Sequence, residues 1–207
     1  MKYPVNHLVA WGGAATIAVA VALLWRHELG PLRALRATLA PAGALSPTIG
    51  GPFTLVDQNG KIVTAADFRG RFMLVYFGYT YCPDVCPTTL TTIADAIDLL
   101  DGDGENVVPV FITVDPARDT SEHLNMYVNY FHPRLVGLTG TAEAVAATAK
   151  AYRVYYAEAR QEGAAEDDYL VDHLSFVFLI GPDGAFRAHF ENGTGAEAMA
   201  KRIREYL

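Results

Sequence analysis

The chain has 207 residues, a formal net charge of −7 and 19% charged residues. This length suits one compact domain with an additional segment and is short for two large domains. Residues 1–45 hold four basic residues and one acidic residue, and this net of +3 leaves −10 for the rest of the chain. An acidic body repels phosphate backbones, which argues against nucleic acid as a partner. It favours cations and basic protein surfaces.

The first distinct segment is an uncharged apolar run at residues 8–25, LVAWGGAATIAVAVALLW. As a helix it would be about 27 Å long, close to the bilayer core of about 30 Å, and Trp11 and Trp25 lie near its ends. We therefore expect an uncleaved transmembrane anchor at residues 8–25, preceded by a short flank at residues 1–7. A cleaved signal peptide is the alternative. Its apolar region usually spans only about 7–15 residues, and the one Ala-x-Ala pattern, at residues 42–44, lies far downstream.

The remaining chain divides into a tether at residues 26–50 and a folded domain at residues 51–207. Asn59-Gly60 between two alternating apolar runs predicts a β-hairpin. Continuous apolar runs predict buried strands, and apolar spacing of three and four residues predicts helices, with Thr120 and Thr141 as N-caps. The predicted strands lie at residues 72–79, 107–114, 174–180 and 185–190, and the predicted helices lie at residues 88–100, 120–131, 141–152 and from about 196.

The order of these elements is a hairpin, then alternating strands and helices, then two strands joined by Gly181-Pro182-Asp183-Gly184 and a last helix. Alternation of this kind predicts a three-layer α/β domain with a central sheet. The last two strands are joined by a four-residue turn, so they must be antiparallel neighbours. A mixed sheet of this order fits a thioredoxin-like arrangement.

The only two cysteines in the chain lie together in Tyr81-Cys82-Pro83-Asp84-Val85-Cys86-Pro87. This loop follows a predicted buried strand and leads into a helix, where the N-terminus favours thiolates. Pro87 suits the first helical position. The Cys-x-x-x-Cys spacing is compatible with a redox disulfide, with two thiolates on a soft metal, and with a small structural disulfide. A disulfide across so short a loop constrains the unfolded chain comparatively little.

A soft metal site with two thiolates usually needs a third ligand, and imidazole is a natural one. His173 stands at the entrance to the strand predicted at residues 174–180. If that strand runs antiparallel to residues 72–79, His173 lies beside the cysteine loop. A lone histidine capping a strand end is the alternative. The other five fit solvated surface positions better than ligation: His7, His27, His123, His132 and His189.

Two thiolates and one imidazole favour Cu(I), which takes few and soft ligands. A structural zinc ion would prefer a fourth ligand. Cu(II) stays open as a second state, because related sites hold it when an oxygen ligand joins.

Three motifs in this order resemble the Sco/SenC family of copper chaperones: Cys82-Pro-Asp-Val-Cys86-Pro, Val114-Asp115-Pro116-Ala-Arg118-Asp119 and Val171-Asp172-His173. The match runs from about Pro47 to Leu207. The resemblance implies a thioredoxin-like fold and copper bound by Cys82, Cys86 and His173. It implies a role in building the dinuclear copper centre of cytochrome c oxidase subunit II, or in supplying another copper-receiving protein. A copper donor protein would load the chain. The resemblance implies a chaperone and not an enzyme, so no catalytic residues are expected.

The resemblance also implies a single-pass protein of the inner membrane whose domain faces the periplasm. Arg26, Arg33 and Arg36 after the anchor would by themselves place the domain in the cytoplasm. The alternative function is a thiol–disulfide reductase that keeps the target's cysteines reduced through Cys82 and Cys86. The sequence favours the copper carrier, because His173 has no needed role in thiol exchange. Asp115, Arg118 and Asp119 are interpreted as a loop-bracing group, and Asp84 and Asp172 as residues that tune the site from outside.

Overall fold

The computed structural model describes residues 49–161, 163, 165 and 168–207. Within these residues no helix is both long enough and apolar enough to cross a membrane. The predicted anchor at residues 8–25, its flank and nearly all of the predicted tether lie outside the described part of the chain.

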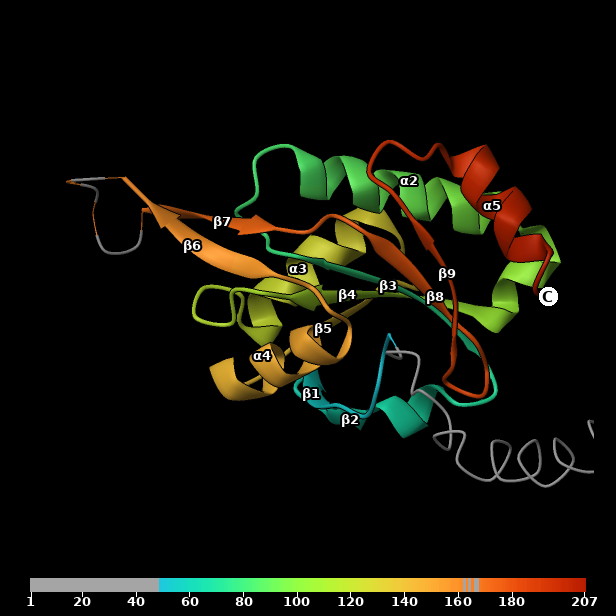
Figure 1. The fold of residues 1–207 in the computed structure, drawn as a ribbon, viewed down its shortest axis with the longest axis horizontal. Coiled ribbons are helices and arrows are strands. Elements are labelled where there is room, and N and C mark those ends of the chain that lie inside the picture. Colours follow the sequence, from blue (N-terminus) through green and yellow to red (C-terminus); the bar gives the residue numbers. More distant parts are fainter. Residues whose placement is uncertain (1–48, 162, 164, 166–167) are drawn as a thin grey trace, which may run out of the picture. The chain divides into compact units, whose positions relative to one another are not determined.

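The described elements follow the predicted alternation of strands and helices, with one additional hairpin (Figure 1). The strands are β1 (Thr54–Asp57), β2 (Ile62–Thr64), β3 (Phe72–Gly78), β4 (Val107–Thr113), β5 (Val136–Thr139), β6 (Tyr156–Arg160), β7 (Tyr169–His173), β8 (Val177–Ile180) and β9 (Phe186–Phe190). The helices are α2 (Val85–Leu99), α3 (Ser121–Phe131), α4 (Ala142–Ala151) and α5 (Ala196–Arg204), with short 3₁₀ turns η1 (Ala65–Phe68) and η2 (Asp101–Asn106).

Seven strands form a mixed central sheet in the order β2-β1-β5-β4-β3-β8-β9. Strands β3, β4 and β5 are parallel to one another, and β8 runs antiparallel to β3, with Val75 opposite Phe178. The predicted hairpin at Asn59-Gly60 is confirmed, because β1 and β2 pair and Gly60 adopts a φ of 77°. Strands β8 and β9 are antiparallel neighbours, also as predicted.

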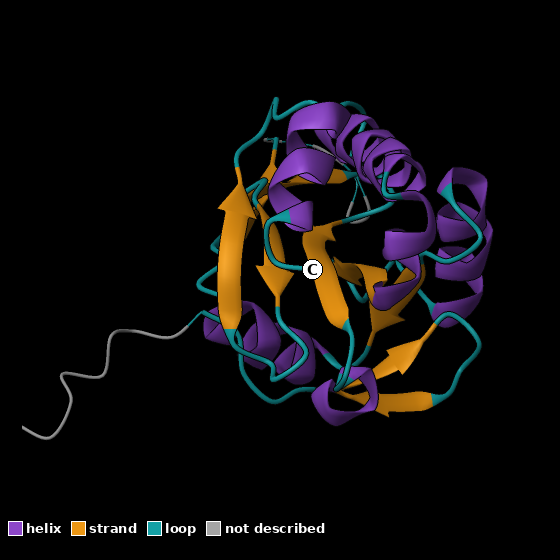
Figure 2. Ribbon diagram, turned by 90° about the vertical axis from the view of Figure 1, so that its right-hand side faces the viewer, coloured by secondary structure: helices purple, strands orange, loops and turns teal. Residues whose placement is uncertain are grey.

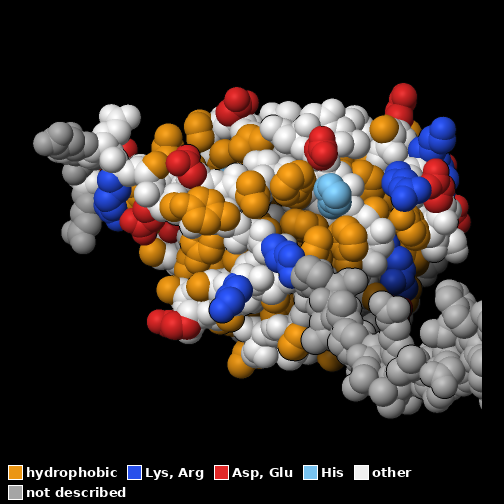
Figure 3. Space-filling view, in the orientation of Figure 1, with side chains coloured by type: hydrophobic (Ala, Val, Ile, Leu, Met, Phe, Trp, Pro, Cys, Tyr) orange, Lys and Arg blue, Asp and Glu red, His pale blue; other side chains and the backbone are white. Residues whose placement is uncertain are grey.

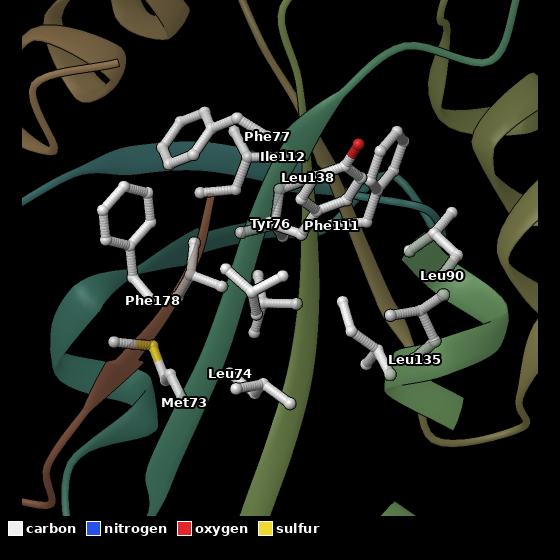
Figure 4. Packing of buried hydrophobic residues seen from close by; sticks show 14 of the residues in the cluster. Met73, Leu74, Tyr76, Phe77, Leu90, Phe111, Ile112, Leu135, Leu138 and Phe178 are labelled. Carbon is white, nitrogen blue, oxygen red and sulfur yellow. The ribbon is translucent and has the colours of Figure 1, made fainter. Parts of the chain in front are cut away.

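Helices cover both faces of this sheet (Figure 2), because the central strands have apolar side chains on both sides. Adjacent residues of β3 point to opposite faces. Tyr76 contacts Cys86 at the start of α2, whereas Phe77 packs against Tyr152, which directly follows α4. Figure 4 shows Phe77 on one side of the strand and Tyr76 with Phe111 on the other. The result is a three-layer α/β domain.

Hydroxyl side chains cap two of the helices as predicted. Thr120 Oγ1 accepts the backbone N–H of His123, and Thr141 Oγ1 accepts that of Ala144, both at 3.2 Å. Each bond satisfies one of the backbone donors that the first helical turn leaves unpaired.

The hairpin of β6 and β7 was not predicted from the sequence. Its strands pair only with each other among the described strands and extend away from the central sheet (Figure 1). The strand predicted from residue 174 in fact begins at Val177, and residues 174–176 connect it to β7. The consequence for the site is that His173 is the last residue of a small separate sheet and does not introduce a strand of the central one.

Candidate metal centre

The two cysteines lie where the central strand β3 passes into helix α2. The helix begins at Val85, so Cys86 is in its first turn and Pro87 is its third residue. The prediction that Pro87 would be the first helical residue is therefore wrong by two positions. Proline is tolerated at this point because the first four N–H groups of a helix have no partner within the helix.

Cys86 is buried completely and is tightly surrounded. The Tyr76 hydroxyl donates a hydrogen bond to Cys86 Sγ at 3.5 Å. A Cβ atom at Gly78 would lie 2.8 Å from the same sulfur, which is closer than any real contact. Glycine at position 78 thus leaves the space in which the sulfur sits, directly above the end of β3.

His173 brings its imidazole to the same point from β7. Its Nε2 lies 3.3 Å from Cys86 Sγ, and its Nδ1 lies 3.4 Å from the Leu174 carbonyl oxygen. A carbonyl can only accept, so in the tautomer with hydrogen on Nδ1 this nitrogen donates to Leu174, and the Nε2 lone pair is then available to a metal ion. The ring also makes edge contacts with Tyr76 and Tyr79, at centroid distances of 6.2 and 5.9 Å.

The side chains of Cys82, Cys86 and His173 thus converge on one point. Their ligand atoms all lie within 4.8 Å of one another, and no fourth Cys, His, Asp or Glu among the described residues joins them. The expected antiparallel arrangement of β3 and β8 accounts for this proximity across 87 residues of sequence. The gathering agrees with the sequence analysis, while the role of the three residues as metal ligands stays a prediction.

The two thiols differ in their electrostatic environment. The hydrogen bond from Cys86 lowers the pKa of Cys82 to about 4, and His173 and the backbone N–H groups of Asp84 and Cys86 act in the same direction. The neighbouring Cys82 sulfur and burial raise the pKa of Cys86. Both cysteines are free thiols, and Cys82 is the one poised as a thiolate at neutral pH.

The remaining described histidines lie outside this cluster. His189 is exposed and His123 is partly buried, with Nδ1 3.3 Å from the Arg118 carbonyl oxygen. The prediction that His132 lies at the surface is wrong. His132 is buried at the end of α3, where Nδ1 accepts the N–H of Arg134 and Nε2 lies 3.2 Å from Asp98. His7 and His27 are outside the described residues, and Asp84 and Asp172 are exposed.

Tyr76 and Thr80 support the site but were not identified from the sequence. Tyr76 was part of an apolar strand, and its hydroxyl was the available signal, since a buried hydroxyl normally has a partner. Thr80 lies two residues before Cys82, and both its N–H and its hydroxyl donate to the Asp119 carboxylate. Spacing alone does not indicate this contact, which joins residues 39 positions apart.

A three-layer α/β domain with a dithiol at the end of a central strand and an imidazole beside it defines a class of protein. Such a site can hold a soft metal ion or exchange thiols for disulfides. The residues of the site are compatible with both functions.

The chain belongs to the SCO1/SenC family, whose model matches residues 42–207. It is 38% identical over 194 residues to Protein sco1 of Schizosaccharomyces pombe, covering 93% of this chain and 74% of that protein. It spans about half the length of several other curated relatives.

Two similar solved structures are of proteins with copper bound. One is Arabidopsis thaliana ScoI with copper bound, at 42% identity and a TM-score of 0.71, covering 76% of this chain and 99% of that one. The other is Bradyrhizobium japonicum ScoI with copper bound, at 40% identity and a TM-score of 0.70, covering 77% and 99%. The described domain therefore has the thioredoxin-like fold of this family.

Proposed function

We propose that this protein is a copper metallochaperone that binds one copper ion through Cys82, Cys86 and His173. It then delivers the ion to the dinuclear copper centre of cytochrome c oxidase subunit II. The observation that carries the proposal is the convergence of two sulfur atoms and one imidazole nitrogen within 4.8 Å. Structures of family members at about 40% identity that hold copper support it.

The donor set favours Cu(I) as the cargo. Two thiolates and one neutral imidazole are soft ligands in the small number that Cu(I) prefers. A structural zinc site normally takes four protein ligands, and the described residues offer three. Cu(II) would be held by the same residues together with an added oxygen ligand. An incomplete coordination shell also leaves room for a recipient's ligand to enter, which is how a carrier passes on its ion.

The location of the site supports transfer between proteins. Both cysteines are buried, Cys86 at 0% and Cys82 at 9% exposed, while Tyr81 beside Cys82 is 53% exposed. In Figure 3, apolar surface with both acidic and basic side chains near it lies over the base of the β6–β7 hairpin. We propose that a copper donor and the oxidase subunit each approach here. We also propose that residues 8–25 anchor the protein in the inner membrane with the domain in the periplasm.

The second candidate function is a thiol–disulfide reductase that keeps the recipient's cysteines reduced. The lowered pKa of Cys82 favours it, because the thiolate is the attacking species and the neighbouring Cys86 can resolve the mixed disulfide. In that reaction the Cys82 sulfur attacks a target disulfide, and the Cys86 sulfur then displaces the reduced target. The chaperone ends with a Cys82–Cys86 disulfide.

A copper titration of the full chain in detergent, reduced and anaerobic, distinguishes the two functions. We expect one Cu(I) per chain, and none after Cys82→Ser, Cys86→Ser or His173→Ala. The exposed His189 supplies a matched control, and His189→Ala should still bind one ion. Oxidised protein should bind none, because a disulfide occupies both thiolates. If His173→Ala binds copper as the parent does, or the oxidised and reduced forms bind equally, the copper site is not the one proposed.

A further inference from the structure

The two halves of the site arrive from separate parts of the fold. The cysteine loop follows β3 in the central sheet, whereas His173 ends the two-stranded hairpin that pairs with no other described strand. Apart from the three-residue connection from His173 to β8, side-chain contacts therefore determine where the hairpin sits relative to the sulfurs. The segment Asp115–Asp119, between β4 and α3, is in contact with both halves.

The first contact is between Asp119 and the cysteine loop. Asp119 is buried completely. Its carboxylate accepts the Thr80 N–H at 3.0 Å, the Thr80 hydroxyl at 2.6 Å and the Thr113 hydroxyl at 2.6 Å. These bonds tie the residue two positions before Cys82 to the end of β4, so the loop is held from within the central sheet.

The second contact is between Arg118 and the hairpin. Its Nη1 donates to the Tyr169 carbonyl oxygen at 3.0 Å, and its guanidinium carbon lies 3.6 Å from the centre of the Tyr169 ring. The same carbon lies 4.7 Å from the centre of the Tyr81 ring, next to Cys82. One guanidinium thus contacts the first residue of the histidine strand and the aromatic ring that precedes the first cysteine.

Asp115 keeps this guanidinium in place. Its Oδ2 accepts from Arg118 Nε, and its Oδ1 accepts the Tyr169 hydroxyl at 2.8 Å. Asp115 and Arg118 are both largely shielded from solvent, with side-chain exposures of 3% and 13%. An ion pair in such surroundings is screened less than one at the surface.

We propose that Arg118 is a positioning residue that joins the histidine strand to the cysteine loop and so sets the distance between the imidazole and the two sulfurs. The inference rests on the proposed copper site. Arginine suits this position because its planar group stacks on aromatic rings while its N–H groups donate in fixed directions. His173 lies four residues beyond Tyr169 on the same short strand, and the Val171 N–H donates to the Tyr79 hydroxyl oxygen at 3.2 Å in between. A shift at Tyr169 therefore reaches His173.

The test is Arg118→Met in the full chain, which keeps length and apolar contact but removes the charge and the N–H donors. Loss of groups that orient metal ligands typically weakens metal binding about 10-fold to 100-fold, and we expect a loss of Cu(I) affinity in that range. The Cu(II) form should show altered nitrogen hyperfine structure from the imidazole. In the metal-free protein, the Val171 amide should exchange with solvent faster than in the parent.

Arg160→Met is the matched control. The Arg160 guanidinium carbon lies 4.4 Å from the centre of the same Tyr169 ring, but the residue sits within the hairpin on β6, where it pairs with Glu158. We expect this variant to keep the parent's affinity and spectrum. An equal loss of Cu(I) affinity in both variants would mean that the effect comes from losing an arginine next to Tyr169, and not from the link that Arg118 makes to the cysteine loop. That result would overturn the proposal.

Two further variants keep the proposal testable if Arg118→Met does not fold. Tyr81→Leu removes the ring on the cysteine side at a half-exposed position and should reproduce the spectral change. Arg118→Lys retains charge without the planar group and should restore little of the affinity. An unchanged Cu(II) spectrum and unchanged Val171 exchange in Tyr81→Leu, or the parent's Cu(I) affinity in Arg118→Lys, would overturn the proposal. If the parent itself binds no copper, the proposed function fails, and the Val171 exchange in the metal-free variants still decides whether Arg118 joins the two segments.

Discussion

Strand β3, which leads into the cysteine loop, is buried at all of its positions, whereas β7, which carries His173, alternates between buried and exposed residues. Strand β3 has β4 on one side and β8 on the other, and α2 continues directly from its loop. Strand β7 has only β6 as a partner among the described strands. The two sulfurs are therefore held by segments that belong to the buried core. The imidazole is held by a strand outside the central sheet, whose position depends on side-chain contacts.

The largest contrast should appear in core substitutions in the two regions. Leu74 in β3 is 0% exposed, and Leu74→Ala should lower the free energy of unfolding by about 3–5 kcal/mol through lost burial and a cavity. Leu170 in β7 is 49% exposed, and Leu170→Ala should change it by about 0.5 kcal/mol or less. Urea denaturation measures both. Similar losses at the two positions would contradict the difference in support between the two segments.

A smaller effect is expected at the contact that holds the cysteine loop. Asp119→Ala removes the acceptor for the Thr80 N–H and for two hydroxyls, and it should lower the free energy of unfolding by about 1–3 kcal/mol. Asp119→Asn keeps one acceptor oxygen and should cost less. Urea denaturation with amide exchange at Thr80 checks this. An Asn variant as unstable as the Ala variant would show that charge, and not hydrogen bonding, is what Asp119 supplies.

The smallest effect is expected at the hydroxyl that faces the buried thiol. Tyr76→Phe removes one hydrogen bond to Cys86 without changing the packing of the ring, and should cost about 0.5–1.5 kcal/mol. Because the bond reaches only the cysteine half of the site, amide exchange in β6 and β7 should stay the same. Faster exchange in the hairpin would mean that the two halves are coupled through Tyr76 as well.

The elements of the central sheet were predicted from the sequence, whereas the β6–β7 hairpin was not. Apolar runs and helical spacing follow directly from burial, so the central strands, the two capped helices and the antiparallel pair β8 and β9 were predicted. The hairpin was missed because β7 mixes Leu170 and Asp172 with buried Tyr169 and Val171, and half-exposed strands give weak signals. His132 was misplaced because its burial depends on Asp98, which comes from another helix.

The candidate site was predicted through topology, not through local pattern. Once β8 was expected to run antiparallel to β3, His173 had to lie near the cysteine loop, and the structure places it there. The contacts of Arg118 with Tyr81 and Tyr169 could not be predicted in this way. They depend on side-chain directions at the ends of three separate segments, which spacing along the chain does not encode.

The separation of His173 from Cys86 by 87 positions has a thermodynamic consequence. An unfolded chain keeps the two sulfurs near each other but has no imidazole at hand, so the complete donor set exists only in the native state. A ligand that binds the native state alone stabilises it in proportion to the logarithm of its concentration over its dissociation constant. If the proposed copper site is correct, ion occupancy and native structure are therefore linked. Unfolding would then release the ion, and a loaded copy would resist unfolding until a recipient took the ion away.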